Sequence, residues 1–127
     1  MKIRDIMTPE PRTCTPEMAL AAAAGLMWDT DCGILPVVEQ GALVGVVTDR
    51  DICIALATRN ARAATMKVGE VAGRTVWTCG PDEDLHAALA VMERLRGTHL
   101  DPNILDAFFK VIEKKRTAAP ESVKLAV

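Results

Sequence analysis

"CGILPVVEQGALVGVVTDRDI" (residues 32–52) is the stretch of sequence that decides the fold. Its two apolar runs, Ile34–Val38 and Leu43–Val47, are separated by the polar turn Glu39-Gln40-Gly41. Two short apolar runs joined in this way predict a β-hairpin. The second run ends in a polar cluster at residues 48–51, and a new apolar run follows. A polar cluster before an apolar run is typical of a helix start, so we expect a helix over about residues 49–58.

An internal repeat surrounds this stretch. "TCTPEMALAAAAGLM" (13–27) aligns with "TCGPDEDLHAALAVM" (78–92) at a constant offset of 65 positions, from 13 to 78. The same offset aligns "IRDIM" (3–7) with "VGEVA" (68–72). We therefore interpret the chain as two copies of one unit.

Each copy is expected to contain a leader, which is the segment before the strand and includes 3–7 in the first copy and 68–72 in the second. A short strand, a turn with proline and a helix follow. The strands are expected at about 11–14 and 75–79, and the helices near 17–29 and 82–95, where apolar residues follow helical spacing. Thr15 and Asp82 are the expected helix caps, because each precedes or follows a proline that suits a first helical turn.

The second copy is expected to be incomplete. Where the offset places a second hairpin, the chain reads "HLDPNILDAFFKVIEKKR" (99–116). Asp101-Pro102 is a strong helix start, and an apolar stripe follows it, so we expect a helix at about 103–116 instead. The expected organisation is a first copy with its linker (1–66), a partial second copy (67–96), an added helical segment (97–116) and a flexible tail (117–127).

The composition excludes several classes of function. The 127 residues suit one compact domain, and a net charge of −2 gives no basic field for nucleic acid. No apolar run approaches the roughly 20 residues of a membrane span, and no signal peptide opens the chain, so we expect a cytoplasmic protein. The four cysteines form no C-x-x-C pair and are expected to be buried and reduced.

The leader, strand, proline turn, helix, hairpin and T-x-x-D motif come in the order that is found in CBS domains. Residues 2–95 therefore resemble a CBS domain pair, also called a Bateman module. The resemblance implies an α+β fold of tandem β-α-β-β-α units, here with the second unit incomplete and followed by an added C-terminal helix. It implies a non-enzymatic, ligand-sensing module that binds an adenine nucleotide such as AMP, ADP or ATP between the repeats.

Thr48, Arg50 and Asp51 are the first candidate binding residues. Backbone N–H groups at a helix N-terminus favour an anion such as phosphate, and a Thr hydroxyl can donate to the same phosphate. A carboxylate one turn on can accept from both ribose hydroxyls, and the Arg50 side chain can add a phosphate contact. The resemblance implies this role through G-h-h-[T/S]-x-x-D, which reads here as Gly45 to Asp51. The alternative is that Thr48 or Asp49 only caps the helix and that Asp51 only occupies its first turn.

The resemblance also implies which residues face that motif. They belong to the leader and first strand of the second copy, where glycine allows a close backbone approach. Val76 or Trp77 is expected to pack on the purine, although Trp77 is equally compatible with a place in the core. The implied binding residues of this segment are Gly73, Arg74, Thr75, Val76 and Trp77.

No catalytic or metal-binding set is expected. His86 and His99 lack partner ligands at metal spacing, and no cofactor is required. "GTHLDPNILDAFFKVIE" (97–113) weakly resembles the end of HD-GYP phosphodiesterase domains, but the metal ligands of that enzyme are missing.

Two main hypotheses follow. The first is the nucleotide-binding regulatory module, which acts on a partner protein that the sequence does not identify. The second is a ligand-free interaction module in which the incomplete second copy and the added helix build a homodimer or larger homo-oligomer. The missing hairpin favours the second, because it leaves an apolar face and a sheet edge open.

Overall fold

The computed structural model describes residues 1–98 and 100–117. The chain divides into two compact units, which are described separately. We call residues 8–78 the hairpin unit, and we call residues 1–7 together with the described residues from 79 onward the helical unit. The predicted tail (apart from Thr117) and His99 lie outside the described residues.

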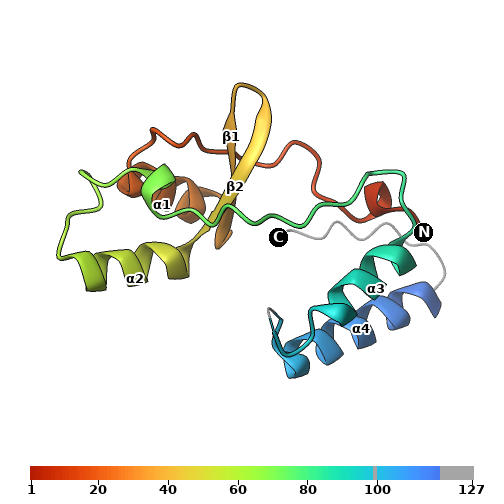
Figure 1. The fold of residues 1–127 in the computed structure, drawn as a ribbon. Helices are drawn as coiled ribbons and strands as arrows, with labels where there is room; N and C mark the ends of the chain where they lie inside the picture. Colours follow the sequence, from red (N-terminus) through yellow and green to blue (C-terminus); the bar gives the residue numbers. More distant parts are fainter. Residues whose placement is uncertain (99, 118–127) are drawn as a thin grey trace. The chain divides into compact units, whose positions relative to one another are not determined.

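The hairpin unit is built around the predicted β-hairpin (Figure 1). Strands β1 (Ile34–Glu39) and β2 (Ala42–Thr48) pair antiparallel, from Ile34 opposite Thr48 to Glu39 opposite Ala42. Gln40 and Gly41 form the turn with φ values of 49° and 79°. Positive φ at both central residues is the geometry that matches the twist of a two-residue hairpin, and glycine adopts it without strain.

Helices α1 (Leu20–Thr30) and α2 (Asp49–Arg59) complete the core of this unit. Alternate hairpin residues, Leu35, Val37 and Val47, are at most 1% exposed, because one face of a strand carries every second side chain. The helices cover that face with residues at helical spacing. The other members of the buried cluster are Cys14, Leu20, Ala23, Met27, Ile52, Ala55, Met66 and Val68.

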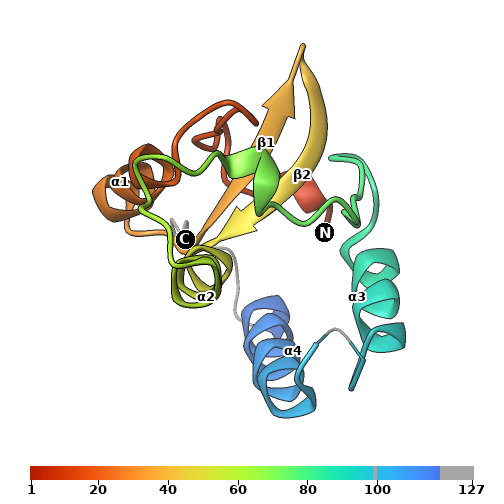
Figure 2. The same cartoon turned by 60° about the vertical axis from the view of Figure 1, so that its left-hand side comes forward.

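The helical unit consists of the first leader and two helices, α3 (Leu85–Arg94) and α4 (Pro102–Thr117), which lie side by side in Figures 1 and 2. The helix predicted at 103–116 is thus confirmed. Asp101 caps α4, since its Oδ1 accepts from the backbone N–H groups of Asn103 and Ile104 at 2.8 and 3.2 Å. Arg96 connects the two helices through ion pairs to Glu93 and Asp106.

The repeat is visible in the backbone, because each leader pairs with the turn of the other copy. Two short 3₁₀ turns, η1 (Ile3–Asp5) and η2 (Val68–Glu70), occupy equivalent positions. Lys2 bridges to Asp84, and Lys67 bridges to Ala19. The two lysines are 65 positions apart, and so are their two partners. The backbone bonds of Leu85 to Met1 and of Leu20 to Met66, both 2.9 Å, repeat the relation.

Because each leader pairs with the turn of the other copy, the predicted helix starts were wrong. Thr15 and Asp82 do not cap the helices; the N-cap positions are Ala19 and Asp84. Pairing with a leader holds the residues just before each helix. Each helix therefore begins later than the position of the proline alone suggests. This relation cannot be read locally, since the pairing residues are far apart in sequence.

The two predicted first strands have different outcomes. Near 11–14 the strand is reduced to one parallel bridge, between Cys14 and Val37. The strand predicted at 75–79 was wrong, because residues 75–79 have no strand or bridge. Its equivalent in the first copy pairs with β1, and the described residues of the second copy contain no hairpin to pair with.

The prediction of four buried cysteines holds only in part. Cys14 is buried, Cys32 is half-buried, and Cys53 and Cys79 are exposed. All four are free thiols. Burial raises the pKa of the Cys14 thiol, because desolvation disfavours the thiolate.

Candidate functional site

Thr48 and Asp51 form a reciprocal cap at the start of α2. The Thr48 backbone N–H and hydroxyl both donate to Asp51 Oδ2, at 2.9 and 2.7 Å. In return, the Asp51 backbone N–H donates to Thr48 Oγ1 at 3.1 Å. This is the capping box that a threonine followed three residues later by an acid forms. The structure therefore confirms that Thr48 caps α2; that the motif does only this stays a prediction.

The cap changes the expected chemistry of the helix N-terminus. The Asp49 N–H donates to the Gly33 carbonyl at 3.0 Å, and the Arg50 N–H donates to Asp49 Oδ1 at 2.7 Å. The Asp51 N–H is bound to Thr48, so the first N–H groups of α2 already have acceptors. The expectation of free N–H donors for a phosphate was wrong, because the Gly33 carbonyl and the side chains of Asp49 and Thr48 accept from them.

Two groups of the motif keep free binding capacity. Among the described residues, none donates a hydrogen bond to Asp51 Oδ1, and none bonds the Arg50 guanidinium. Asp51 is half-buried and Arg50 is exposed. A carboxylate oxygen and a guanidinium are suitable partners for a hydroxyl and a phosphate, respectively.

Gly73 lies against the same strand. Val46 and Gly73 exchange backbone hydrogen bonds of 3.0 and 2.9 Å, so one isolated antiparallel bridge attaches the second leader to β2. A Cβ on Gly45 would lie 2.6 Å from the Gly73 carbonyl oxygen, so only glycine fits at Gly45 without a shift. The sequence placed Gly45 in the motif but gave no sign of this packing role, which depends on a residue 28 positions later (45 to 73).

The remaining predicted residues follow Gly73 along the chain. Arg74 and Thr75 are exposed, Val76 is half-buried, and Trp77 is 62% exposed. The alternative that Trp77 belongs to the core was wrong. The structure therefore places Gly73 beside β2 and leaves the aromatic face of Trp77 accessible.

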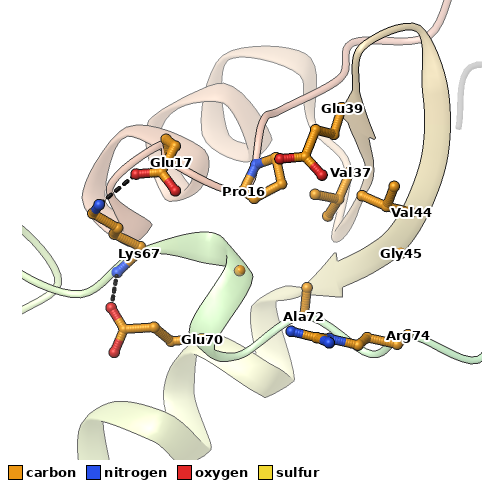
Figure 3. A pocket seen from close by; sticks show the side chains of 11 residues that line it. Pro16, Glu17, Val37, Glu39, Val44, Gly45, Lys67, Glu70, Ala72 and Arg74 are labelled. Carbon is orange, nitrogen blue, oxygen red and sulfur yellow. Dashed lines mark hydrogen bonds and ion pairs between the residues drawn. The ribbon is translucent and has the colours of Figure 1, made fainter.

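A pocket of about 450 Å³ lies in the hairpin unit next to this segment (Figure 3). Arg74 is the predicted site residue that lines it; Thr48, Arg50, Asp51, Gly73, Thr75, Val76 and Trp77 do not. Its walls come from the Pro16 turn, the hairpin and the second leader. The lining residues are Pro16, Glu17, Val37, Glu39, Val44, Gly45, Lys67, Gly69, Glu70, Ala72 and Arg74.

Two kinds of feature are absent from the described part of the chain. No three His, Cys, Asp or Glu side chains gather closely enough there to hold a metal ion. No helix among those residues has the length and apolar character needed to cross a membrane.

Comparison with known proteins identifies a CBS domain in this chain. The model of the CBS domain matches residues 3–58. The CBS domain-containing protein YhcV of Bacillus subtilis (strain 168) is 36% identical over 90 residues, which are 71% of this chain and 64% of that protein. The chain thus spans less than two thirds of the length of this curated relative.

Two solved structures agree in fold and sequence. Hypoxic Response Protein I, with two coordinated zinc ions, has a TM-score of 0.65 and 30% identity, covering 74% of this chain and 77% of its own. The CBS domain pair of protein MJ0100, in complex with 5′-methylthioadenosine and S-adenosyl-L-methionine, has a TM-score of 0.64 and 27% identity. It covers 74% of this chain and 73% of its own.

Proposed function

We propose that this chain, which belongs to the family of CBS-domain proteins, is a non-enzymatic regulatory module that binds an adenine nucleotide. The observation that carries the proposal is the free Oδ1 of Asp51, held at a fixed helix start beside the exposed Arg50 guanidinium. The MJ0100 domain pair supports it, because both of its bound ligands contain adenosine.

The proposed contacts follow from the free groups. Asp51 Oδ1 accepts from a ribose hydroxyl while Oδ2 stays in the capping box. Arg50 binds the phosphate through its side chain, since the backbone N–H groups of α2 are occupied. The adenine lies against residues 73–77, where Trp77 offers an accessible aromatic face for stacking.

Ligand binding at this place can regulate through the second leader. The leader is attached to β2 by two backbone bonds at Gly73, so a ligand that contacts both stabilises their association. The ligand shifts the equilibrium between the attached and the detached leader. The size of this shift equals the difference in the binding free energy of the ligand for the two states. The regulated partner is another protein, which this chain does not identify.

The test is a thermal-unfolding series of the full chain with AMP, ADP and ATP. A ligand present at 100 times its dissociation constant stabilises the folded state by about 2.7 kcal/mol, which shifts the midpoint by several degrees. Asp51→Asn is expected to reduce the shift strongly, because the amide is a weaker acceptor for ribose. Asp49→Asn is the matched control, since Asp49 bonds its own helix backbone, and its shift is expected to equal that of the wild type.

A second candidate function is favoured by the exposed apolar residues of α4. Ile104 is 72% and Val111 is 51% exposed, and the described residues 100–117 contain a helix where the repeat offset places a hairpin. We propose a truncated second repeat whose added helix builds a homodimer or larger homo-oligomer. A monomer by light scattering at high protein concentration, with and without nucleotide, would count against it.

A further inference from the structure

The pocket of Figure 3 shares Arg74 with the segment proposed to contact the adenine, but Thr48, Arg50 and Asp51 do not line it. Its volume of about 450 Å³ is within the range of small-molecule pockets. The apolar part of its wall is formed by Pro16, Val37, Val44 and Ala72. Exposed Val44 and half-buried Pro16 present apolar surface to a ligand of modest size, whereas Val37 is buried.

Three of the five charged residues that line this pocket are already engaged with one another or with the backbone. Lys67 forms an ion pair with Glu17, and its backbone N–H donates to Glu70 Oε1 at 2.9 Å. The hydrogen bond from Lys67 to Glu17 raises the pKa of the lysine, so it stays protonated and paired. Together these three residues carry a net charge of −1, because the Glu70 carboxylate accepts from a backbone N–H while Lys67 pairs with Glu17.

Glu39 and Arg74 are different. Within the part of the chain that the structure describes, neither side chain has a hydrogen bond or an ion pair, and both are exposed. Figure 3 shows Glu39 entering from the end of β1 and Arg74 from the segment after η2, on opposite sides of the pocket. The pocket thus offers one free negative group, one free positive group and an apolar wall between them.

We propose that this pocket binds a small zwitterion with an apolar side chain, as presented by a free amino acid or a dipeptide. The ligand ammonium group binds the Glu39 carboxylate. The ligand carboxylate binds the Arg74 guanidinium, whose planar fork matches a carboxylate in a bidentate way. The aliphatic side chain packs on Val44 and Pro16. A singly charged ligand satisfies one of the two free groups and leaves the other without a partner.

Titration calorimetry of the full chain tests this with leucine, methionine and leucyl-leucine. Leucine and leucyl-leucine distinguish a free amino acid from a dipeptide, because they separate the ammonium and carboxylate groups by different lengths. N-acetyl-leucine and leucinamide each remove one ligand charge. We expect each blocked form to bind at least about 10-fold more weakly than leucine, or than leucyl-leucine if the dipeptide is preferred, as expected for a charge-assisted hydrogen bond.

Matched variants assign each charge to its partner. Glu39→Gln is expected to bind leucine and N-acetyl-leucine with the same affinity, while it still distinguishes leucine from leucinamide. Arg74→Gln is expected to show the reverse pattern. Glu10→Gln, an exposed acid outside the pocket, is expected to behave as the wild type.

Two outcomes would overturn the proposal: no binding of any of the three zwitterions by the folded wild type, or discrimination by Glu39→Gln that equals that of the wild type. Failure of the nucleotide proposal is recognised separately, because AMP is titrated in parallel and Glu39 takes no part in its proposed contacts. Circular dichroism of each variant confirms that the chain is folded, and both substitutions are at exposed positions that spare the core.

Discussion

The two copies of the repeat have the same leader contacts but different amounts of buried core. Lys67 pairs with Glu17 in one and Lys2 with Asp82 in the other, and both leaders form a 3₁₀ turn closed by an acid, Glu70 or Asp5. The first copy adds a hairpin and α2, and its unit contains the whole buried cluster. In the described helical unit only Leu85 and Leu105 are buried hydrophobic residues.

The difference separates two structural roles within a repeat, positioning of the helix start and burial of apolar surface. Pairing between a leader and a proline turn sets where the helix begins, and it works without a hairpin. Burial of apolar surface requires a second layer, which the hairpin provides for α1 and α2. We therefore expect the hairpin unit to hold most of the stability and the helical unit to open first.

The largest expected effect comes from truncating the two cores in turn. Leu35→Ala removes a side chain with no exposed surface, at an expected cost of about 3 kcal/mol in the free energy of unfolding. Leu105→Ala is expected to cost less globally and to open α3 and α4 locally. Urea unfolding with hydrogen exchange measures both. Equal global costs would show that the two units unfold as one.

Gly45→Ala tests the attachment of the second leader to the hairpin. The new Cβ meets the Gly73 carbonyl at 2.6 Å, so we expect a loss of about 2 kcal/mol and faster exchange of the Gly73 and Val46 amides. Gly25→Ala on α1 is the control. A Cβ there has nothing within 4 Å, and alanine favours a helix, so about 0.5–1 kcal/mol of stabilisation is expected. A Gly45→Ala protein with unchanged amide protection would contradict the packing role.

Thr48→Ala tests the cap of α2, a helix that the described second copy lacks. It removes the hydroxyl that accepts from the Asp51 N–H, and we expect a loss of about 1 kcal/mol. Thr48→Ser is expected to restore most of it. If serine and alanine behave alike in thermal unfolding, the cap does not stabilise the hairpin unit.

Cys14 and Cys79 occupy equivalent positions in the two copies. Comparing their thiols tests the difference in burial between the copies, with the smallest expected effect. Cys14 is 1% exposed and its Sγ donates to the Pro36 carbonyl of β1, at 3.5 Å; Cys79 is exposed. Burial raises the pKa of Cys14, so less thiolate is present at any pH near neutrality. Alkylation followed by intact-mass and peptide analysis is expected to modify Cys79 and Cys53 first. Comparable alkylation rates at Cys14 and Cys79 would mean that the hairpin does not protect the thiol of its copy from the reagent.

Sequence reasoning predicted the elements better than their ends. The hairpin, α2 and α4 each have a local signal: apolar alternation around Gly41, the cluster at Thr48, and Asp101-Pro102. The starts of α1 and α3 depend on leaders paired across the chain, so local capping rules placed them too early. The strand expected at 75–79 depended on a hairpin, and the described residues of the second copy contain none.

The sequence predicted the candidate site only in part, as it did the fold. The motif at 48–51 was recognised, and its proposed binding role remains to be tested. The occupied N–H groups of α2 were missed, because they depend on Asp49 and on the Gly33 carbonyl turning toward them. The pocket of Figure 3 brings together segments near residues 16, 39 and 74, whose proximity only the fold reveals.

The most direct test of the proposed function compares AMP with 2′-deoxy-AMP in calorimetric titrations of the wild type and Asp51→Asn. If Asp51 Oδ1 accepts from the ribose, the missing hydroxyl weakens binding to the wild type by about 10-fold, or about 1.4 kcal/mol. The same change then has little effect on Asp51→Asn, because the acceptor is already impaired. Equal affinity of the wild type for the two nucleotides, or no binding of AMP, would contradict the account.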